Sequence, residues 1–169
     1  MPAEPEEVHC RIITEKTEIE AVTPAWNALL DQSSCNRVFS SPVWFMTACQ
    51  VDPGLSPCLL VGERRGIPVS FLPLAIEKST ETAVFPGSMN NYNDLITRKG
   101  DVVHTAASLF DFARIQPKPY RRMKLKWLRT CSNCVLAAAA FAGCAGRHSM
   151  VEIGRWKEKL KFGLTWSAG

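Results

Sequence analysis

The chain has 169 residues, the length of one ordinary domain with enough residues to bury a core. Hydrophobic residues make up 46% and charged residues 21%, close to the averages of soluble globular proteins, which excludes a largely disordered chain. The net charge of +4 is mild and the basic residues are spread along the chain, so no nucleic-acid-binding arm is indicated.

The first predicted elements are a strand and a helix. Residues 8–16 alternate apolar and polar side chains, which is typical of a half-buried strand. Thr17 and Glu20 form a capping box, and apolar residues then recur at helical spacing. Pro24 lies within this run, so the first turn is expected to begin later than the capping box indicates.

A second helix and a group of strands follow. Ser41 and Pro42 are an N-cap and first-turn pair, and they predict a helix that ends near Gln50. Turn residues then separate four predicted strands, over Cys58–Glu63, Ile67–Glu77, Thr82–Phe85 and Asp94–Thr97. The two prolines of the second strand predict an edge position or a bulge.

The last regular elements are a helix over Asp101–Ala113 and a strand over Met123–Leu128. Strands joined by short turns favour antiparallel pairing. The order strand, helix, helix, strands, helix, strand predicts an α/β (α+β) domain, with a mixed, largely antiparallel sheet flanked by helices.

The tail from residue 131 has a different character. It is rich in alanine and does not continue the rhythm of strands and helices, so we expect a domain over residues 8–130 and a separate tail over 131–169. The tail is expected to be helical near Cys134–Ala142 and weakly so over Glu152–Leu164, or to be disordered. On this interpretation the sheet is incomplete and the chain is a fragment.

Cysteines and termini indicate a cytoplasmic protein. The first ten residues are acidic and lack the apolar segment of a signal peptide, and seven cysteines are an odd number, so reduced thiols are expected. The apolar run Cys134–Ala145 is shorter than the roughly 20 residues of a membrane span. We expect no membrane association.

Two groups of residues are tested against binding functions. Cys131 and Cys134 with Cys144 and His148 supply zinc-ligand types, but their spacing matches no common zinc fold, so no metal site is expected. The basic group Lys118–Lys126 is interpreted as a solvated strand face without the aromatic platform of a single-strand binder, so nucleic acid is not an expected partner.

A polar loop, Asn90–Asp94, lies between apolar strands. Polar loops at strand ends often line binding clefts. Asn and Asp also favour turns through side-chain bonds to the backbone. The residues leave both interpretations open.

Several short segments, in order, resemble a known family. They are Trp26 with Leu29 and Leu30, Val38–Trp44, Gly66–Leu74, Phe85–Gly87 and Asn91–Leu95. Together they resemble the N-terminal half of the GNAT-like acyltransferases of the cellulose-biosynthesis CelD type. Asn91 stands where the D-Y-x-D motif of that family has its first acid.

The resemblance implies a GNAT-like fold and an N-acyltransferase that uses acetyl-CoA or another acyl-CoA. Such proteins carry two GNAT-like units, and the second holds the acyl-CoA site, whose pyrophosphate is cradled by an Arg/Gln-x-x-Gly-x-Gly/Ala turn at a helix N-terminus. The sequence has no such turn, so no cofactor-binding residue is assigned and the chain is expected to be a truncated or non-catalytic half.

The resemblance also implies an acceptor cleft for an unidentified amine. Tyr92 and Asp94 are the candidate catalytic residues, and Asn91, Asn93 and Trp44 are the candidate substrate-binding residues. The alternative is a non-catalytic interaction module, in which an open sheet edge pairs with a partner chain.

Overall fold

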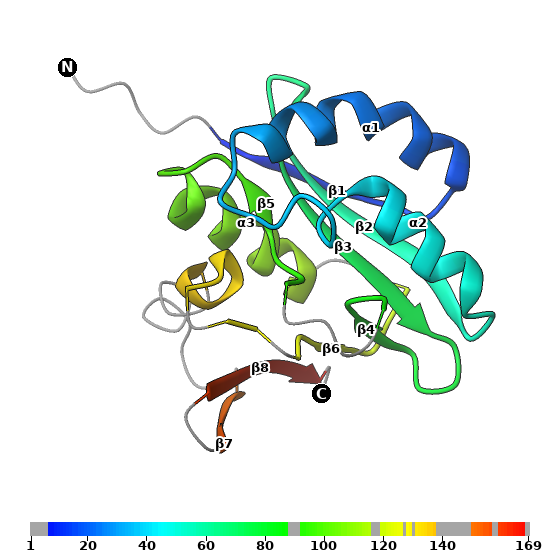
Figure 1. Ribbon diagram of the computed structural model, residues 1–169, viewed down its shortest axis with the longest axis vertical. Coiled ribbons are helices and arrows are strands. Elements are labelled where there is room, and N and C mark those ends of the chain that lie inside the picture. The colour runs from blue at the N-terminus through cyan, green and yellow to red at the C-terminus, as the bar shows by residue number, and fades with distance from the viewer. Residues whose placement is uncertain are drawn as a thin grey trace.

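The computed structural model describes residues 7–87, 92–115, 119–126, 128–129, 131–137, 150–156 and 159–167. These residues form one sheet with helices on both faces (Figure 1). The helices are α1 (Lys16–Asp31), α2 (Pro42–Val51) and α3 (Val102–Ile115). The strands are β1 (His9–Ile13), β2 (Leu55–Arg64), β3 (Ile67–Glu77), β4 (Thr82–Val84), β5 (Ile96–Thr97), β6 (Arg122–Lys124), β7 (Met150–Trp156) and β8 (Lys159–Ser167).

The strand order is β1-β2-β3-β4-β6-β8-β7, and β5 also pairs with β3. Every described pairing is antiparallel except that of β4 with β6, which is parallel. Since α3 lies between β4 and β6 in the chain, it serves as the crossover that a parallel pair needs. The predicted mixed, largely antiparallel sheet is confirmed.

Two of the three predicted helix starts are confirmed, those of α2 and of α3, which begins at Val102 directly after Asp101. The Ser41 Oγ accepts the Trp44 N–H at 3.1 Å, and Pro42 opens α2, as the N-cap pattern predicts. The capping box at Thr17 is wrong, because α1 already begins at Lys16 and its N-cap Glu15 makes no side-chain cap bond. Pro24 lies inside α1.

Strands β2 and β3 form a tight hairpin. Its two turn residues, Arg65 and Gly66, have φ of 51° and 74°, which matches the right-handed twist of the strands. The register shifts between Gly62 and Glu63, next to Pro68, so the predicted bulge is confirmed. The edge position is wrong, because β3 lies between β2 and β4.

Strands β4 and β5 are two parts of one interrupted neighbour of β3. Val84 of β4 pairs with Ala75, and Ile96 of β5 pairs with Phe71. The two partners on β3 are four residues apart, whereas Val84 and Ile96 are twelve residues apart. Of the extra residues, 85–87 and 92–95 are described; they lie outside the strands and include Tyr92 and Asp94. Together these described residues are called the loop after β4.

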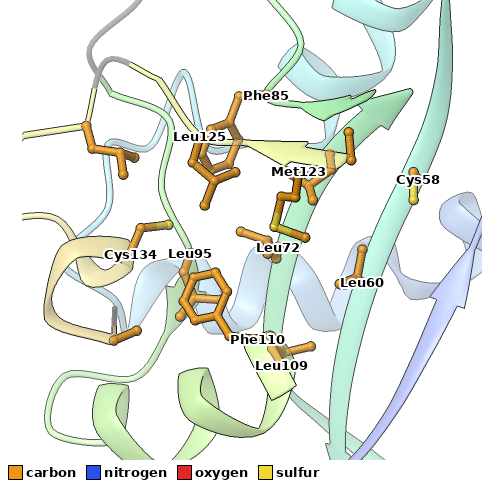
Figure 2. Close-up of a cluster of buried hydrophobic side chains, with 14 of the residues drawn as sticks. Cys58, Leu60, Leu72, Phe85, Leu95, Leu109, Phe110, Met123, Leu125 and Cys134 are labelled. Carbon is orange, nitrogen blue, oxygen red and sulfur yellow. The ribbon is translucent and has the colours of Figure 1, made fainter. Parts of the chain in front are cut away.

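Each face of the sheet carries its own core. On one face Trp26 of α1 stacks on Phe71 of β3 at 5.2 Å between ring centroids, with Phe45 of α2 beside it. On the other face side chains of β2, β3, α3 and β6 converge with Leu95 and Cys134 (Figure 2). Because side chains alternate along a strand, neighbours such as Leu59 and Leu60 enter different cores.

The tail departs from its prediction. Residues 133–137 are helical, which agrees with the start of the helix expected over Cys134–Ala142, and residues 138–142 lie outside the described part. The helix expected over Glu152–Leu164 is wrong, because β7 and β8 pair antiparallel there and β8 pairs with β6. Gly154 and Gly163 weaken a helix at this place, and sheet pairing overrides the spacing of apolar residues.

Part of the basic group has the predicted strand character, since β6 covers Arg122–Lys124, a shorter range than the predicted Met123–Leu128. Met123 is buried between the exposed Arg122 and Lys124, so the charged side chains of β6 occupy its solvated face. Arg121 pairs with Glu81 at 2.6 Å. None of the helices described is both long enough and apolar enough to cross a membrane.

Candidate functional site

Asp94 lies at the centre of a buried hydrogen-bond network. Its Oδ1 accepts the backbone N–H groups of Leu95 at 2.8 Å and Cys134 at 2.9 Å, and its Oδ2 accepts that of Asn133 at 2.9 Å. The side chain is almost fully buried. The carboxylate thereby joins the loop after β4 to the start of the helix at residues 133–137, which Ser132 also caps through the N–H of Val135.

Burial dominates the electrostatics of this carboxyl. Desolvation raises the pKa of Asp94, while the three backbone N–H groups and a hydrogen bond from the Cys134 thiol act in the opposite direction. The pKa of the fully buried Cys134 thiol is also raised, by desolvation and then by the Asp94 charge. An amine that bound to Asp94 would have to displace bonds that hold two segments of the fold together.

Asn133 and Cys35 extend the network. The Asn133 side-chain amide donates to the Leu95 carbonyl at 2.8 Å and to the Cys35 Sγ at 3.5 Å, and the Cys35 thiol donates to the same carbonyl at 3.2 Å. Burial raises the pKa of Cys35 to about 12, so the thiol stays protonated at neutral pH. Neither Asn133 nor Cys35 was selected from the sequence as a site residue. Ser132, an N-cap residue type just before Asn133, was the sequence feature that could have indicated a helix start there.

A row of rings includes Tyr92, which lies two residues before Asp94 in the chain. Phe39 contacts Trp44 edge-on at 4.8 Å and stacks on Tyr92 at 5.3 Å between centroids. The Arg129 guanidinium lies over the Tyr92 ring at 5.3 Å, a cation–π distance. The structure thus brings the candidates Trp44 and Tyr92 together through Phe39. Tyr92 remains 41% exposed, so the row is open to solvent at this ring.

Two donors in this row are buried without a hydrogen-bond partner, Trp44 Nε1 and Arg129 Nε. Gly87, at φ 75°, packs against the Trp44 indole, where a Cβ would lie 3.1 Å from the ring. A buried unpaired donor costs about 1–3 kcal/mol. The row is therefore packed at some cost to stability.

A groove of about 420 Å³ lies beside α2, with Trp44 in its wall. Its other lining residues come from α2, the start of β2, the end of β3, and β4 with the segment after it: Thr47, Ala48, Val51, Asp52, Leu55, Glu77, Val84, Phe85 and Gly87. Asp52 and Glu77 are its charged lining residues, and the sequence analysis had not selected them.

The other residues that the sequence singled out differ in burial and in whether the structure describes them. Asn93 is buried next to Asp94, so these two lie beneath the surface while Tyr92 and Trp44 lie nearer to it. Asn91 lies outside the described residues, as do Cys144 and His148. Within the described ranges, no three His, Cys, Asp or Glu side chains gather as metal ligands would.

The start of α3 carries a charge pair. The Arg64 guanidinium holds the Asp101 carboxylate at 3.0 and 3.4 Å, one nitrogen to each oxygen. Asp101 immediately precedes the first helical residue, and Arg98 and Lys99 lie exposed in the turn before it. This helix N-terminus therefore already faces a carboxylate, the charge that its dipole favours.

Comparisons with known proteins agree on the fold. No protein-family model matches the sequence, and no curated protein matches it significantly. The ribosomal-protein-S18-alanine N-acetyltransferase of Escherichia coli superposes with a TM-score of 0.51 at 11% identity, over 95% of this chain and 97% of that one. A probable acetyltransferase of Staphylococcus epidermidis gives a TM-score of 0.51 at 9% identity, over 96% and 100%. From its layers, its strand order and these neighbours, the chain has the fold of the GNAT N-acetyltransferases.

Proposed function

We propose that the chain is an N-acyltransferase-type unit that binds an amine acceptor and does not by itself hold acyl-CoA at the start of α3. The fold supports the acyltransferase class. The sequence resemblance supports a finer assignment, to the N-terminal half of a tandem CelD-type protein of cellulose biosynthesis. In that arrangement acyl-CoA is bound by a second unit.

The Arg64–Asp101 pair carries the proposal. In GNAT enzymes backbone N–H groups at a helix N-terminus cradle the pyrophosphate of the cofactor. Here the Asp101 carboxylate stands at that end of α3 and takes both Arg64 contacts. Like charges about 4 Å apart repel by up to roughly 4 kcal/mol near a protein surface, before screening by Arg64. Arg98 and Lys99 are exposed, so water weakens their attraction for an anion. The residues at this helix end do not fit the pyrophosphate of acyl-CoA.

The acceptor side has the better support. The aromatic row from Trp44 to Tyr92 offers a partly exposed apolar surface against which the body of an amine substrate can pack, while the cation–π position over the Tyr92 ring is taken by Arg129. Asp94 contributes by holding the loop that carries Tyr92, since its oxygens are bonded to backbone N–H groups of the segment after β6. Tyr92 and Trp44 would contact the acceptor, while Asp94 would be a positioning residue.

Calorimetric titration with acetyl-CoA, together with a melting curve, tests the proposal. We expect no saturable heat and no rise in melting temperature for the natural chain. Replacing Asp101→Asn removes the negative charge and leaves Arg64 available, so a saturable heat should appear in this variant, since a gain in affinity of about tenfold or more corresponds to about 1.4 kcal/mol. Asp31→Asn is the matched control, because Asp31 also pairs with an arginine, Arg37, at 3.0 Å.

Saturable binding of acetyl-CoA by the natural chain would refute the proposal. If neither the natural chain nor Asp101→Asn binds, the missing cradle stands but Asp101 is not its cause. A gain in the Asp31→Asn control would show that net charge alone, and not this helix end, governs the binding.

The alternative function is a non-catalytic interaction module, and the position of β1 favours it. Among the described strands, β1 ends the strand order and pairs only with β2, so within this part of the chain its other edge can accept a partner strand. Arg11 in this strand pairs with Glu63 at 3.0 Å and approaches Glu18 at 3.8 Å. A charged residue on a short edge strand discourages pairing, so the acyltransferase-type unit has more support. Light scattering at two protein concentrations would detect a self-associating module.

A further inference from the structure

We propose that the groove beside α2 binds a cationic amine with an apolar body. The inference rests on the proposed function in one respect, that such an amine would be the acyl acceptor. The groove has a volume of about 420 Å³, within the roughly 300–1,000 Å³ typical of small-molecule sites.

The walls of the groove favour an apolar body. Its lining includes Trp44 and Val51 of α2 together with Leu55 and Phe85, which come from two other segments of the chain. Val51 is 77% exposed, so its apolar surface is available to a ligand. The half-buried Trp44 adds an aromatic ring, whose face attracts cations.

The charge of the groove selects a cation. Asp52 and Glu77 line it, and its described lining includes no lysine or arginine, although the whole chain has a net charge of +4. The two carboxylates share one corner, because Glu77 pairs with Leu55 and the Leu55 N–H bonds to the Asp52 carbonyl at 3.1 Å. The nearby Lys78 ammonium donates to the Pro53 carbonyl at 2.8 Å.

The helix itself adds to this negative corner. Asp52 is the C-cap of α2, so the carbonyl end of the helix dipole lies at the same place. Each carboxylate is held by one local bond, Asp52 Oδ1 by the Gly54 N–H at 2.8 Å and Glu77 Oε2 by the Thr80 hydroxyl at 3.0 Å. The corner is thus fixed before a ligand arrives, which lowers the entropy cost of binding.

A pair of probes separates charge from shape. Phenethylamine, a cation at neutral pH, is titrated against phenethyl alcohol, which has the same ring and chain without the charge. We expect the amine to bind saturably and about tenfold more tightly than the alcohol, the difference that two partly exposed charge contacts allow.

Variants of the lining test the location. The double variant Asp52→Asn with Glu77→Gln keeps one acceptor oxygen for each local bond and removes both charges. It should bind the amine about as weakly as the alcohol. The double variant Asp31→Asn with Glu20→Gln is the control, because it makes the same change of charge on α1. Ala48→Leu fills the groove and should abolish binding of both probes while the melting curve stays cooperative.

Four results would overturn the inference: no saturable binding of the amine, equal binding of amine and alcohol, an unchanged affinity in the Asp52 and Glu77 double variant, or an equal loss in the α1 control. The acetyl-CoA titration is separate from these measurements. Failure of the groove and failure of the proposed function can therefore be told apart.

Discussion

Removal of the Asp94 carboxylate should destabilise the fold by an amount that depends on the substitute. Asp94→Ala leaves the backbone N–H groups of Leu95, Asn133 and Cys134 without their acceptor. Each buried donor without a partner costs about 1–3 kcal/mol. Even at the low end the three sum to about 3 kcal/mol, a large part of the roughly 5–15 kcal/mol that stabilises a domain.

Asp94→Asn should cost less. Its remaining oxygen can keep the two N–H bonds that Oδ1 accepts, from Leu95 and Cys134, while its amide group faces the N–H of Asn133. One lost bond predicts a decrease in the free energy of unfolding of about 1–2 kcal/mol. The difference between the alanine and asparagine variants is the signature of a capping carboxylate.

The pH dependence has a definite sign. Because the pKa of Asp94 is raised above its ordinary value of 3.8, the folded protein holds this proton more tightly than the unfolded chain. The stability contributed by this proton is fully present below about pH 4 and is lost as the pH rises through the folded pKa. Asparagine does not titrate, so the deficit of Asp94→Asn should be larger at pH 4.5 than at pH 7.

Urea denaturation followed by circular dichroism, at pH 4.5 and pH 7, measures all three proteins. An alanine variant that loses less than about 1 kcal/mol, or an asparagine variant that loses as much as alanine, would contradict the capping role. A deficit of the asparagine variant that grows with pH would contradict a raised pKa.

Two matched pairs of substitutions test the packing around the aromatic row. Trp26→Phe should lower the free energy of unfolding by about 2–3 kcal/mol, because the fully buried Trp26 Nε1 donates to the Ser40 carbonyl at 2.9 Å. Trp44→Phe removes an unpartnered donor and should change the free energy of unfolding by less than about 1 kcal/mol. Equal losses of the two variants in urea denaturation would refute this. Gly87→Ala should lower the free energy of unfolding by about 1 kcal/mol more than Gly66→Ala. The two glycines have nearly the same φ, 75° and 74°, but of the two only a Cβ at Gly87 meets a neighbour within 4 Å, the Trp44 ring. Similar melting temperatures of the two variants would show that the ring moves aside.

Local patterns predicted the local structure well. The Ser41–Pro42 pair placed the start of α2, because an N-cap and a first-turn proline act within a few residues. Turn residues on either side of Cys58–Glu63 and Ile67–Glu77 predicted the strands β2 and β3, whereas the burial of both faces of the sheet was not predicted and appears only in the two separate cores. Where the prediction failed, as with β7 and β8, the deciding interaction is pairing with a distant strand.

The candidate site was predictable only in part. The polar loop was found because Asn and Asp stand out between apolar strands, yet its partners Asn133 and Cys35 are distant in the sequence. Cys131 and Cys134 were considered as zinc-ligand types and assigned to no metal site; the structure exposes the Cys131 thiol and buries that of Cys134 against Asp94, a contact that the sequence did not predict. The sequence did not indicate Glu77 as a groove residue, because its place there depends on how α2 packs against the sheet.

The long reach of the Asp94 bonds has a consequence for the order of events during synthesis. Its oxygens bond to residues 39 and 40 positions later in the chain. At the usual 5–20 residues per second, a ribosome needs roughly 2–8 s to add that length. Throughout this interval the nascent chain carries a carboxylate that its later core will bury, and two of its three backbone N–H partners, those of Asn133 and Cys134, have not yet been made. The part of this core that Cys134 and Ala137 complete therefore stays uncovered until the ribosome has passed this segment.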